Sequence, residues 1–215
     1  MTSESLKERL KALEEKVRVL EDTEEIKKLQ RTYGFYLDNG MWDEILDMFS
    51  ENTVSLEVSD SGVYLGKAGV EKFFRGIMGR YKPVPKDSMT VTMSLMGVIH
   101  VAPDGKTAKG RWNNLMFLSS ADNGSEPLLG QGIYEIEYAK ANGKWMFTKF
   151  NFYLNMRTPL KDGWVKTPVA TSMKRESIVK PDLPTTVYEP YPTDFIPPFH
   201  YPHPITGKYP GTRKK

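Results

Sequence analysis

Residues 29–50, LQRTYGFYLDNGMWDEILDMFS, constrain the fold of this chain more than any other stretch. Two apolar stripes at helical spacing run through it: Leu29, Tyr33 and Leu37, then Trp42, Ile45, Leu46 and Phe49. The Asn39-Gly40 pair between the stripes is typical of a tight turn. The stretch therefore predicts two short helices joined by that turn, with the phenol of Tyr33 and the carboxylate of Asp38 close to the end of the first helix.

The N-terminal segment carries a heptad seam. Its apolar residues are spaced four, three, four and three: Leu6, Leu10, Leu13, Val17 and Leu20. Because about two heptads are too short for a self-sufficient coiled coil, we expect this helix to dock on its own or a neighbouring subunit. Asp22, with Glu25 three residues later, is typical of a capping box and predicts that a fresh helix begins near Thr23. We therefore assign residues 1–22 to an N-terminal amphipathic helix.

The central part of the chain predicts a sheet with one more helix. Strand-like runs lie at about 54–58, 63–65, 88–101, 106–119, 130–139 and 144–157, with Asp104-Gly105 and Asn142-Gly143 as hairpin turns. A helix over about 67–80 has a buried stripe made of Val70, Phe73, Phe74 and Ile77. A long antiparallel meander and about three core helices indicate an α+β fold, which we assign to residues 23–157.

The composition of the chain changes at Thr158. Eleven of the fifteen prolines lie beyond this residue, together with Trp164, Tyr188, Tyr191, Phe195, Phe199, Tyr201 and Tyr209. A free disordered tail is poor in aromatic residues. We therefore expect residues 158–215 to form an extended arm laid over a surface, such as that of a neighbouring subunit.

Composition excludes several classes of protein. Charged residues make up 27% and hydrophobic residues 39% of the 215, as in an ordinary soluble globular protein. No apolar run has the length of a membrane helix, and the charged start MTSESLKERL does not resemble a secretory signal, so we expect a cytoplasmic protein. The absence of cysteine excludes disulfides, thiolate catalysis and zinc-thiolate sites.

Cofactor and nucleic-acid motifs are also missing. The net charge is +3, but the basic residues are scattered apart from a terminal RKK, so we expect no nucleic-acid partner. No Walker loop, G-x-G-x-x-G, H-E-x-x-H, EF-hand or Ser-His-Asp arrangement is present, and we expect neither a metal nor an organic cofactor. Any chemistry must then rest on proton transfer and electrostatic stabilisation.

Four short sequence motifs resemble those of a known family. They occur in order over roughly residues 24–157: Y-x-x-x-L-D-x-x-x-W-D-E-I, S-G-V-Y-L-G-K-A-G-V-E-K-F-F, D-G-K-T-A-K-G-R-W and N-G-K-W. Together they resemble the SnoaL-like branch of the NTF2-like superfamily, whose fold is a cone of helices against a curved sheet. Similar proteins include bile-acid and scytalone dehydratases and bacterial lyases that release formaldehyde and water from lignin-derived diarylpropane diols.

The resemblance implies catalytic roles for Tyr33 and Asp38. In the dehydratases a tyrosine and an aspartate at these positions line the pocket with a histidine, and one group removes a proton while another protonates the leaving hydroxyl. This chain departs from that pattern, because the histidine position falls at about Thr92 and a further pocket carboxylate at about Met116. The alternative is that Tyr33 is a core aromatic residue and Asp38 a helix-end cap.

Further residues are candidates for substrate binding. They are Trp42, Glu57, Trp112, Asn114, Met116, Lys149, Asn151 and Tyr153. By period-two alternation Trp112, Asn114 and Met116 share one face of their strand, and Lys149, Asn151 and Tyr153 share one face of theirs. Burying a row of polar side chains in a core costs free energy unless the row faces a cavity. The row of Lys149, Asn151 and Tyr153 therefore faces either a cavity or solvent. Glu57 is either a buried acid or an outward edge residue.

Two classes of function follow from these features. The first is a cofactor-independent lyase that acts on a small hydroxylated aromatic compound by acid–base elimination, or a dehydratase or isomerase of a polycyclic substrate. The second is a non-catalytic binding or assembly module of the same superfamily. The heptad seam and the arm predict a homo-oligomer, a dimer or a trimer, without a membrane partner.

Overall fold

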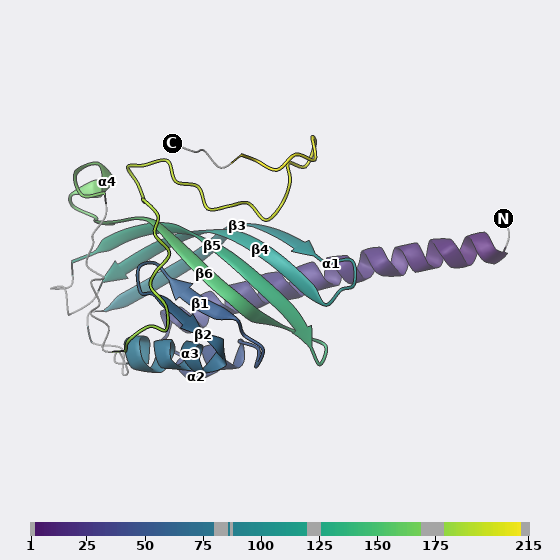
Figure 1. Ribbon diagram of the computed structural model, residues 1–215, viewed down its shortest axis with the longest axis horizontal. Coiled ribbons are helices and arrows are strands. Elements are labelled where there is room, and N and C mark those ends of the chain that lie inside the picture. The colour runs from purple at the N-terminus through teal and green to yellow at the C-terminus, as the bar shows by residue number, and fades with distance from the viewer. Residues whose placement is uncertain (1–2, 80–85, 87, 120–125, 169–178, 212–215) are drawn as a thin grey trace.

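The computed structural model describes residues 3–79, 86, 88–119, 126–168 and 179–211. The described residues form one six-stranded sheet with the helices of residues 3–78 on one side of it (Figure 1). The strands are β1 (Ser55–Val58), β2 (Val63–Leu65), β3 (Met89–Val101), β4 (Thr107–Ser119), β5 (Leu128–Ala141) and β6 (Lys144–Pro159). The helices are α1 (Ser3–Asp38), α2 (Trp42–Asp47), α3 (Gly66–Phe73), the π-helix η1 (Phe74–Met78) and the short α4 (Gly163–Lys166). The α+β class expected from the sequence is confirmed.

The long helix α1 differs from its prediction. It runs without a break over 36 residues, so the expected new helix at Thr23 is wrong. Asp22 does not cap a helix, because its carboxylate accepts hydrogen bonds from Lys140 Nζ at 2.6 Å and from Trp145 Nε1 at 2.9 Å. Burial raises the pKa of Asp22, but these bonds and the charges of Lys140 and Arg18 outweigh it and hold the pKa below its ordinary value. Asp22 therefore fastens the middle of α1 to the β5–β6 hairpin.

The sheet has the order β2-β1-β6-β5-β4-β3. Strands β3 to β6 form the expected antiparallel meander, whereas β1 pairs with β6 in parallel, which the sequence analysis did not predict. Register shifts interrupt the β3–β4 ladder once and the β5–β6 ladder twice. Such bulges bend a strand and increase its twist, and the sheet here curves around the helices (Figure 1).

The predicted connection between α1 and α2 is confirmed. Gly40 has a φ of 62°, a conformation that favours glycine, and it turns the chain between the two helices. The predicted stripe on α3 and η1 is also buried, since Val70, Phe73, Phe74 and Ile77 are at most 2% exposed. These helices and the second half of α1 cover the concave, or inner, face of the sheet.

The inner face is lined mainly by aromatic side chains. Alternate residues of the central strands supply Trp112, Tyr134, Tyr138, Phe147, Phe150 and Phe152, which are all at most 5% exposed. Gly132 lies among them, and a Cβ atom on it would meet the Phe152 ring at 2.4 Å. Large rings and small residues thus interlock to form one core with α1, α2 and α3.

The C-terminal arm lies over the opposite, outer face of the sheet (Figure 1). The amide of Val63 donates to the Leu183 carbonyl at 3.0 Å, the amide of Tyr191 donates to the Asn155 carbonyl at 3.0 Å, and Arg111 Nη1 donates to the Pro197 carbonyl at 3.1 Å. Residues 179–201 therefore cover this chain's own sheet. Whether they also contact a neighbouring subunit, as the sequence suggested, stays a prediction.

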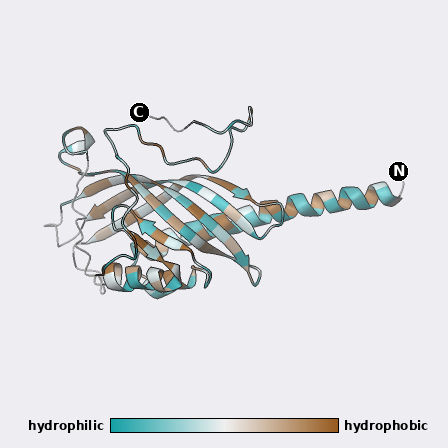
Figure 2. Cartoon of the chain, viewed as in Figure 1, coloured by the Kyte–Doolittle hydropathy of each residue, from teal (hydrophilic) through white to brown (hydrophobic). Residues whose placement is uncertain are grey.

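The first half of α1 projects away from the rest of the molecule (Figures 1 and 2). The seam residues Leu6, Leu10, Leu13, Val17 and Leu20 are 50–67% exposed, so this part of the helix does not dock on the described part of its own chain. Among the described helices, none combines the length and the apolar character needed to cross a membrane.

Candidate active site

Tyr33 lies at the centre of the aromatic inner face. It is 3% exposed, and its ring packs against Phe150 and Phe147 at centroid distances of 5.0 and 5.7 Å. It also meets Tyr134 edge-on at 6.3 Å. The position follows from the helical stripe of α1, because residues 26, 30 and 33 face the sheet and are buried.

Asp38 is the last residue of α1, at the edge of this aromatic core. Burial raises the pKa of Asp38 to about 6, and the side chain and backbone of Thr92 offset part of this rise. The negative end of the helix dipole also disfavours a carboxylate at this position, and no basic residue lies in the last turn of α1. A carboxylate with such a pKa can both take and return a proton near neutral pH.

Two phenols share the environment of this carboxylate. Burial, the proximity of Tyr134 and the charge of Asp38 raise the pKa of Tyr33 well above its usual value. Burial likewise raises the pKa of Tyr134, the Tyr33 phenol offsets part of the rise, and the charge of Asp38 adds to it. Asp38 therefore acts electrostatically on both phenols. Both remain protonated at neutral pH, so they can donate hydrogen bonds or protons but cannot serve as bases.

Several buried polar atoms near this group lack a hydrogen-bond partner among the described residues. They are Asp38 Oδ1, Trp42 Nε1, Thr92 Oγ1 and both side-chain atoms of Asn114, Oδ1 and Nδ2. Although Thr92 is close enough to lower the pKa of Asp38, neither Thr92 Oγ1 nor Asp38 Oδ1 has a partner with normal hydrogen-bond geometry. Buried polar groups are normally paired. A concentration of exceptions is typical of a surface that binds a polar ligand.

Strand pairing and ring contacts connect these residues. Thr92 and Asn114 lie on the same face, because Thr92 is opposite Met116, which is two residues from Asn114 on β4. Trp42 is connected to Tyr33 through a chain of ring contacts. The Trp42 ring stacks on Phe74 at a centroid distance of 6.1 Å, and Phe74 contacts Phe49. Phe49 contacts Phe150, which packs against Tyr33. Donors, acceptors and a titrating carboxylate are thus set in one apolar, aromatic shell.

Trp112 lies on the same face but has a structural partner. Its Nε1 donates to the Tyr138 hydroxyl at 3.0 Å, which donates to Gln30 Oε1 at 3.4 Å. Gln30 Nε2 in turn donates to Ser94 Oγ at 3.2 Å. This network ties α1 to β3, β4 and β5, so Trp112 is satisfied within the protein. Met116 is half-buried and packs against the core.

Four of the predicted binding residues lie on the other face. Glu57 is buried under the arm, where its Oε1 accepts hydrogen bonds from the Thr186 amide at 2.6 Å and the Thr185 hydroxyl at 3.0 Å. Asn151 is directly opposite Glu57, and Lys149 and Tyr153 share its face by alternation. The Tyr153 ring contacts Tyr188 of the arm at 5.5 Å. The structure therefore does not bring these four residues to Tyr33 and Asp38.

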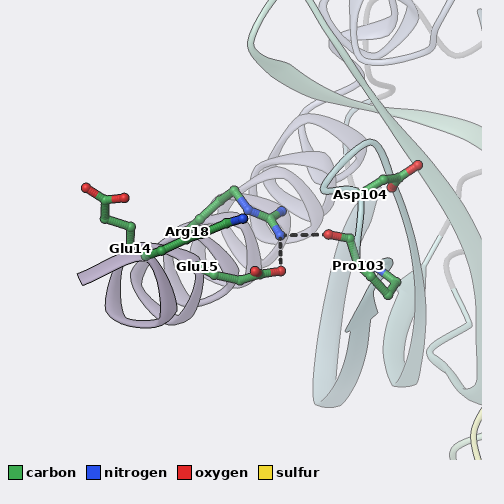
Figure 3. A pocket seen from close by; sticks show the side chains of 6 residues that line it. Glu14, Glu15, Arg18, Pro103 and Asp104 are labelled. Carbon is green, nitrogen blue, oxygen red and sulfur yellow. Dashed lines mark hydrogen bonds and ion pairs between the residues drawn. The ribbon is translucent and has the colours of Figure 1, made fainter. Parts of the chain in front are cut away.

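The histidines His100 and His200 meet on this outer face, 3.3 Å apart between Nδ1 and Nε2. His200 Nδ1 lies 3.1 Å from Glu135 Oε2, whose side chain also pairs with Arg111. Within the described ranges, no three His, Asp or Glu side chains converge as metal ligands do. A separate surface depression lies where α1 crosses the turn at 102–105 (Figure 3); it is lined by Lys11, Glu14, Glu15, Arg18, Pro103 and Asp104.

Sequence reasoning missed Tyr134 and did not assign a role to Thr92. Gly130, Gly132 and Tyr134 alternate along the sequence and so share one face of their strand. A tyrosine that follows two glycines on the same face indicates a pocket-facing phenol, and this pattern could have identified Tyr134. Thr92 occupies the position where the resemblance implied a histidine. Its side chain faces Asp38, so the site carries a hydroxyl where a second base was expected.

The comparison with known families agrees with this fold. The SnoaL-like domain matches residues 18–151, which is more than half of the chain. The chain is a member of the SnoaL-like family. The resemblance inferred from the four sequence motifs is therefore confirmed. The matching part begins near the middle of α1 and ends in β6.

This SnoaL-like protein also resembles solved structures. A hexachlorocyclohexane dehydrochlorinase, LinA-type3 from Novosphingobium barchaimii, is 18% identical, with 67% of this chain and 94% of that chain covered and a TM-score of 0.57. A proposed scytalone dehydratase from Novosphingobium aromaticivorans is 18% identical over 67% of this chain and 91% of that chain, also with a TM-score of 0.57. An NTF2-like protein from the same organism is 18% identical over 73% and 94%, with a TM-score of 0.53. These similarities confirm the NTF2-like fold.

Proposed function

We propose that this SnoaL-like protein is a cofactor-independent lyase that acts on a small hydroxylated aromatic compound by acid–base elimination. The observation that carries the proposal is the group of unpartnered polar atoms around Asp38, whose pKa burial raises to about 6. Purely structural groups in a core are paired, whereas groups that act on a ligand are completed by it. The dehydrochlorinase and the proposed dehydratase of the same fold lend support, since both names describe eliminations.

Asp38 is proposed as the base and Tyr33 as the acid. In the simplest elimination, Asp38 removes a proton from a carbon next to an aromatic ring or a carbonyl, the electron pair forms a double bond, and the hydroxyl on the adjacent carbon leaves as water with a proton from Tyr33. Tyr134 supports Tyr33, because each phenol shifts the pKa of the other. Thr92 is proposed to orient the carboxylate in place of the histidine of related dehydratases.

The polar atoms also define the substrate class. Trp42 Nε1 can only donate, whereas the amide of Asn114 can donate from Nδ2 and accept at Oδ1. A ligand with two oxygen functions on a frame that fits among aromatic rings can satisfy both. A diol with an aromatic substituent meets these requirements, and a flat polycyclic alcohol is the next class to examine.

A phenolic diarylpropane diol is the specific substrate we favour. Its phenol loses its proton to solvent and pushes electrons toward the benzylic carbon, where the hydroxyl takes a proton from Tyr33 and leaves as water, so that a quinone methide forms. Asp38 then takes the proton of the primary hydroxyl, the adjacent carbon–carbon bond breaks and formaldehyde is released. The electron pair of that bond forms a carbon–carbon double bond, and the quinone methide becomes an aromatic phenolate, which takes up a proton from solvent. The substrate supplies its own electron push, which removes the need for a catalytic histidine. We propose a homo-oligomer in the cytoplasm as the working form.

The test offers the full-length protein a panel of phenolic diols and polycyclic alcohols. Formaldehyde is assayed together with the ultraviolet absorbance of a conjugated product. With a substrate that is turned over, Asp38→Asn should lower turnover by about 10²–10⁴-fold, the usual contribution of an acid–base group. Asp47→Asn is the matched control, because Asp47 also ends a helix but is exposed. Saturable binding without turnover for every compound would instead support the binding-module function, and full activity of Asp38→Asn would refute the proposed base.

A further inference from the structure

The projecting half of α1 leaves an apolar face uncovered. Its five seam residues are 50–67% exposed, although the same helix is tightly packed further along, where Asp22, Ile26 and Gln30 are at most 1% exposed. We infer that this seam pairs with the seam of a second copy of the chain, in parallel and in register, to form a two-stranded coiled coil. The inference does not depend on the proposed catalysis.

The contacts of α1 with its own chain leave the seam accessible. Arg18 Nη2 donates to the Pro103 carbonyl at 3.0 Å, and Asp22 binds Lys140. With 100° between successive helical residues, Arg18 and Asp22 lie nearly opposite the row of Leu13, Val17 and Leu20. In Figure 3, Arg18 and Glu15 turn toward the loop at Pro103 while Glu14 extends away from it. The body therefore lies behind the helix and does not block a partner from reaching the seam.

Charges beside the seam favour a parallel arrangement. In heptad terms Leu10 and Val17 are a positions, Arg9 and Lys16 are g positions, and Glu14 and Glu21 are e positions. Parallel helices place g of one chain beside the following e of the other, which pairs Arg9 with Glu14 and Lys16 with Glu21 of the second copy. All four side chains are exposed. An antiparallel pair would bring g beside g, where both residues are basic and repel.

The apolar residues favour two strands. Leucine occupies the d positions at Leu6, Leu13 and Leu20, and β-branched Val17 occupies one of the two a positions, a combination typical of parallel dimers. About two heptads would not pair as an isolated peptide, because helix nucleation is costly. Here the second half of α1 packs on the sheet and already nucleates the helix, so pairing of the first halves does not have to pay the cost of nucleation. We therefore expect a reversible dimer with an affinity in the micromolar range.

The first experiment is sedimentation equilibrium of the full-length protein over a micromolar concentration series. A dimer is expected, and Leu13→Asp should raise its dissociation constant by at least about tenfold, since an unpaired charge would enter the seam. Ala12→Asp is the matched control, because Ala12 is next to the seam but faces solvent at a c position, and it should leave the constant unchanged. A monomer at all concentrations, a trimer, or a dimer that Leu13→Asp does not weaken would overturn the inference.

Charge exchange tests the flanking pairs. A variant with Glu14→Lys and Glu21→Lys, and another with Arg9→Glu and Lys16→Glu, should each self-associate at least about tenfold more weakly than the wild type. An equimolar mixture of the two should form a heterodimer, because every g–e pair then joins opposite charges. Failure of the mixture to associate more strongly than either variant alone would contradict the proposed pairs.

Direction is tested with a single cysteine, since the chain has none of its own. Leu6 is the d position nearest the N-terminal end of the seam, so Leu6→Cys places one thiol at that end. Parallel chains bring the two thiols together, and oxidation should give a disulfide-linked dimer that reducing agent separates. In an antiparallel pair the thiols would lie more than about 20 Å apart. A lack of cross-linking in a variant that still dimerises would refute the parallel arrangement.

Discussion

Replacing Asp38 with asparagine should stabilise the protein at neutral pH while it removes the proposed base. Burial raises the pKa of Asp38 from 3.8 to about 6, so the folded protein binds this proton more tightly than the unfolded chain does. The contribution to stability is therefore fully present below about pH 4 and is lost as the pH rises through about 6. Asparagine has nearly the same shape and does not titrate, so Asp38→Asn should escape this loss.

The magnitude follows from the shift. About two pKa units at about 1.4 kcal/mol each give roughly 3 kcal/mol, which we reduce to about 1–2 kcal/mol because the carboxylate is partly accessible to solvent. Between about pH 4 and pH 8, the free energy of unfolding of Asp38→Asn should rise by this amount relative to the wild type. Urea unfolding followed by circular dichroism measures the difference at each pH.

Two results would refute this reasoning. A difference between wild type and Asp38→Asn that does not change with pH would mean that folding does not perturb this carboxylate. The same pH-dependent difference in Asp47→Asn would mean that the effect is general to aspartates at helix ends. In the wild type, kcat/KM should rise with pH through about 6 and then level off, since the base must be ionised in the free enzyme.

Four further outcomes are expected. Tyr33→Phe should keep the ring packing and change stability by only about 1 kcal/mol in urea unfolding, yet lower turnover, with less than additive loss when combined with Asp38→Asn. Asn114→Leu should raise the free energy of unfolding by about 1 kcal/mol, because both polar atoms lack partners, and raise KM by about tenfold. Asp22→Asn should lower the free energy of unfolding by about 1–3 kcal/mol, because a buried ion pair is broken. Glu57→Gln should weaken the hydrogen bonds by which β1 holds Thr186 of the arm, so limited proteolysis between 179 and 201 should be faster while kcat is unchanged.

Local patterns allowed much of the fold to be predicted. The stripes around Tyr33 and Trp42, the hairpin turns and the buried face of α3 all follow from spacing within a few residues, and each is found in the structure. The parallel pairing of β1 with β6 joins segments about 90 residues apart, and no turn signal announces it. The local spacing of Asp22 and Glu25 predicts a helix cap, but the partner of Asp22 is Lys140, 118 positions away in the sequence, which no local pattern reveals.

The candidate site was harder to predict because alternation defines two faces of a strand without saying which faces inward. Asn151 and Tyr153 share one face of β6, as alternation predicted, but that face lies under the arm, where Glu57 is opposite Asn151. Asn114 and Tyr134 point the other way, where the curvature of the sheet and the docking of α1 create the aromatic shell. That curvature depends on bulges and on contacts between distant segments, which a single sequence does not reveal.

The unbroken length of α1 has a practical consequence for anyone who attaches this protein to a surface or to another protein. At about 1.5 Å per residue, the helix carries its N-terminal end roughly 50 Å from Asp38. A tether at that end would hold the protein on a stiff stalk, clear of the support, with the edge around Asp38 unobstructed. A pull on this helix would reach the sheet through Arg18, which is bonded to Pro103, and through Asp22, which is bonded to Lys140.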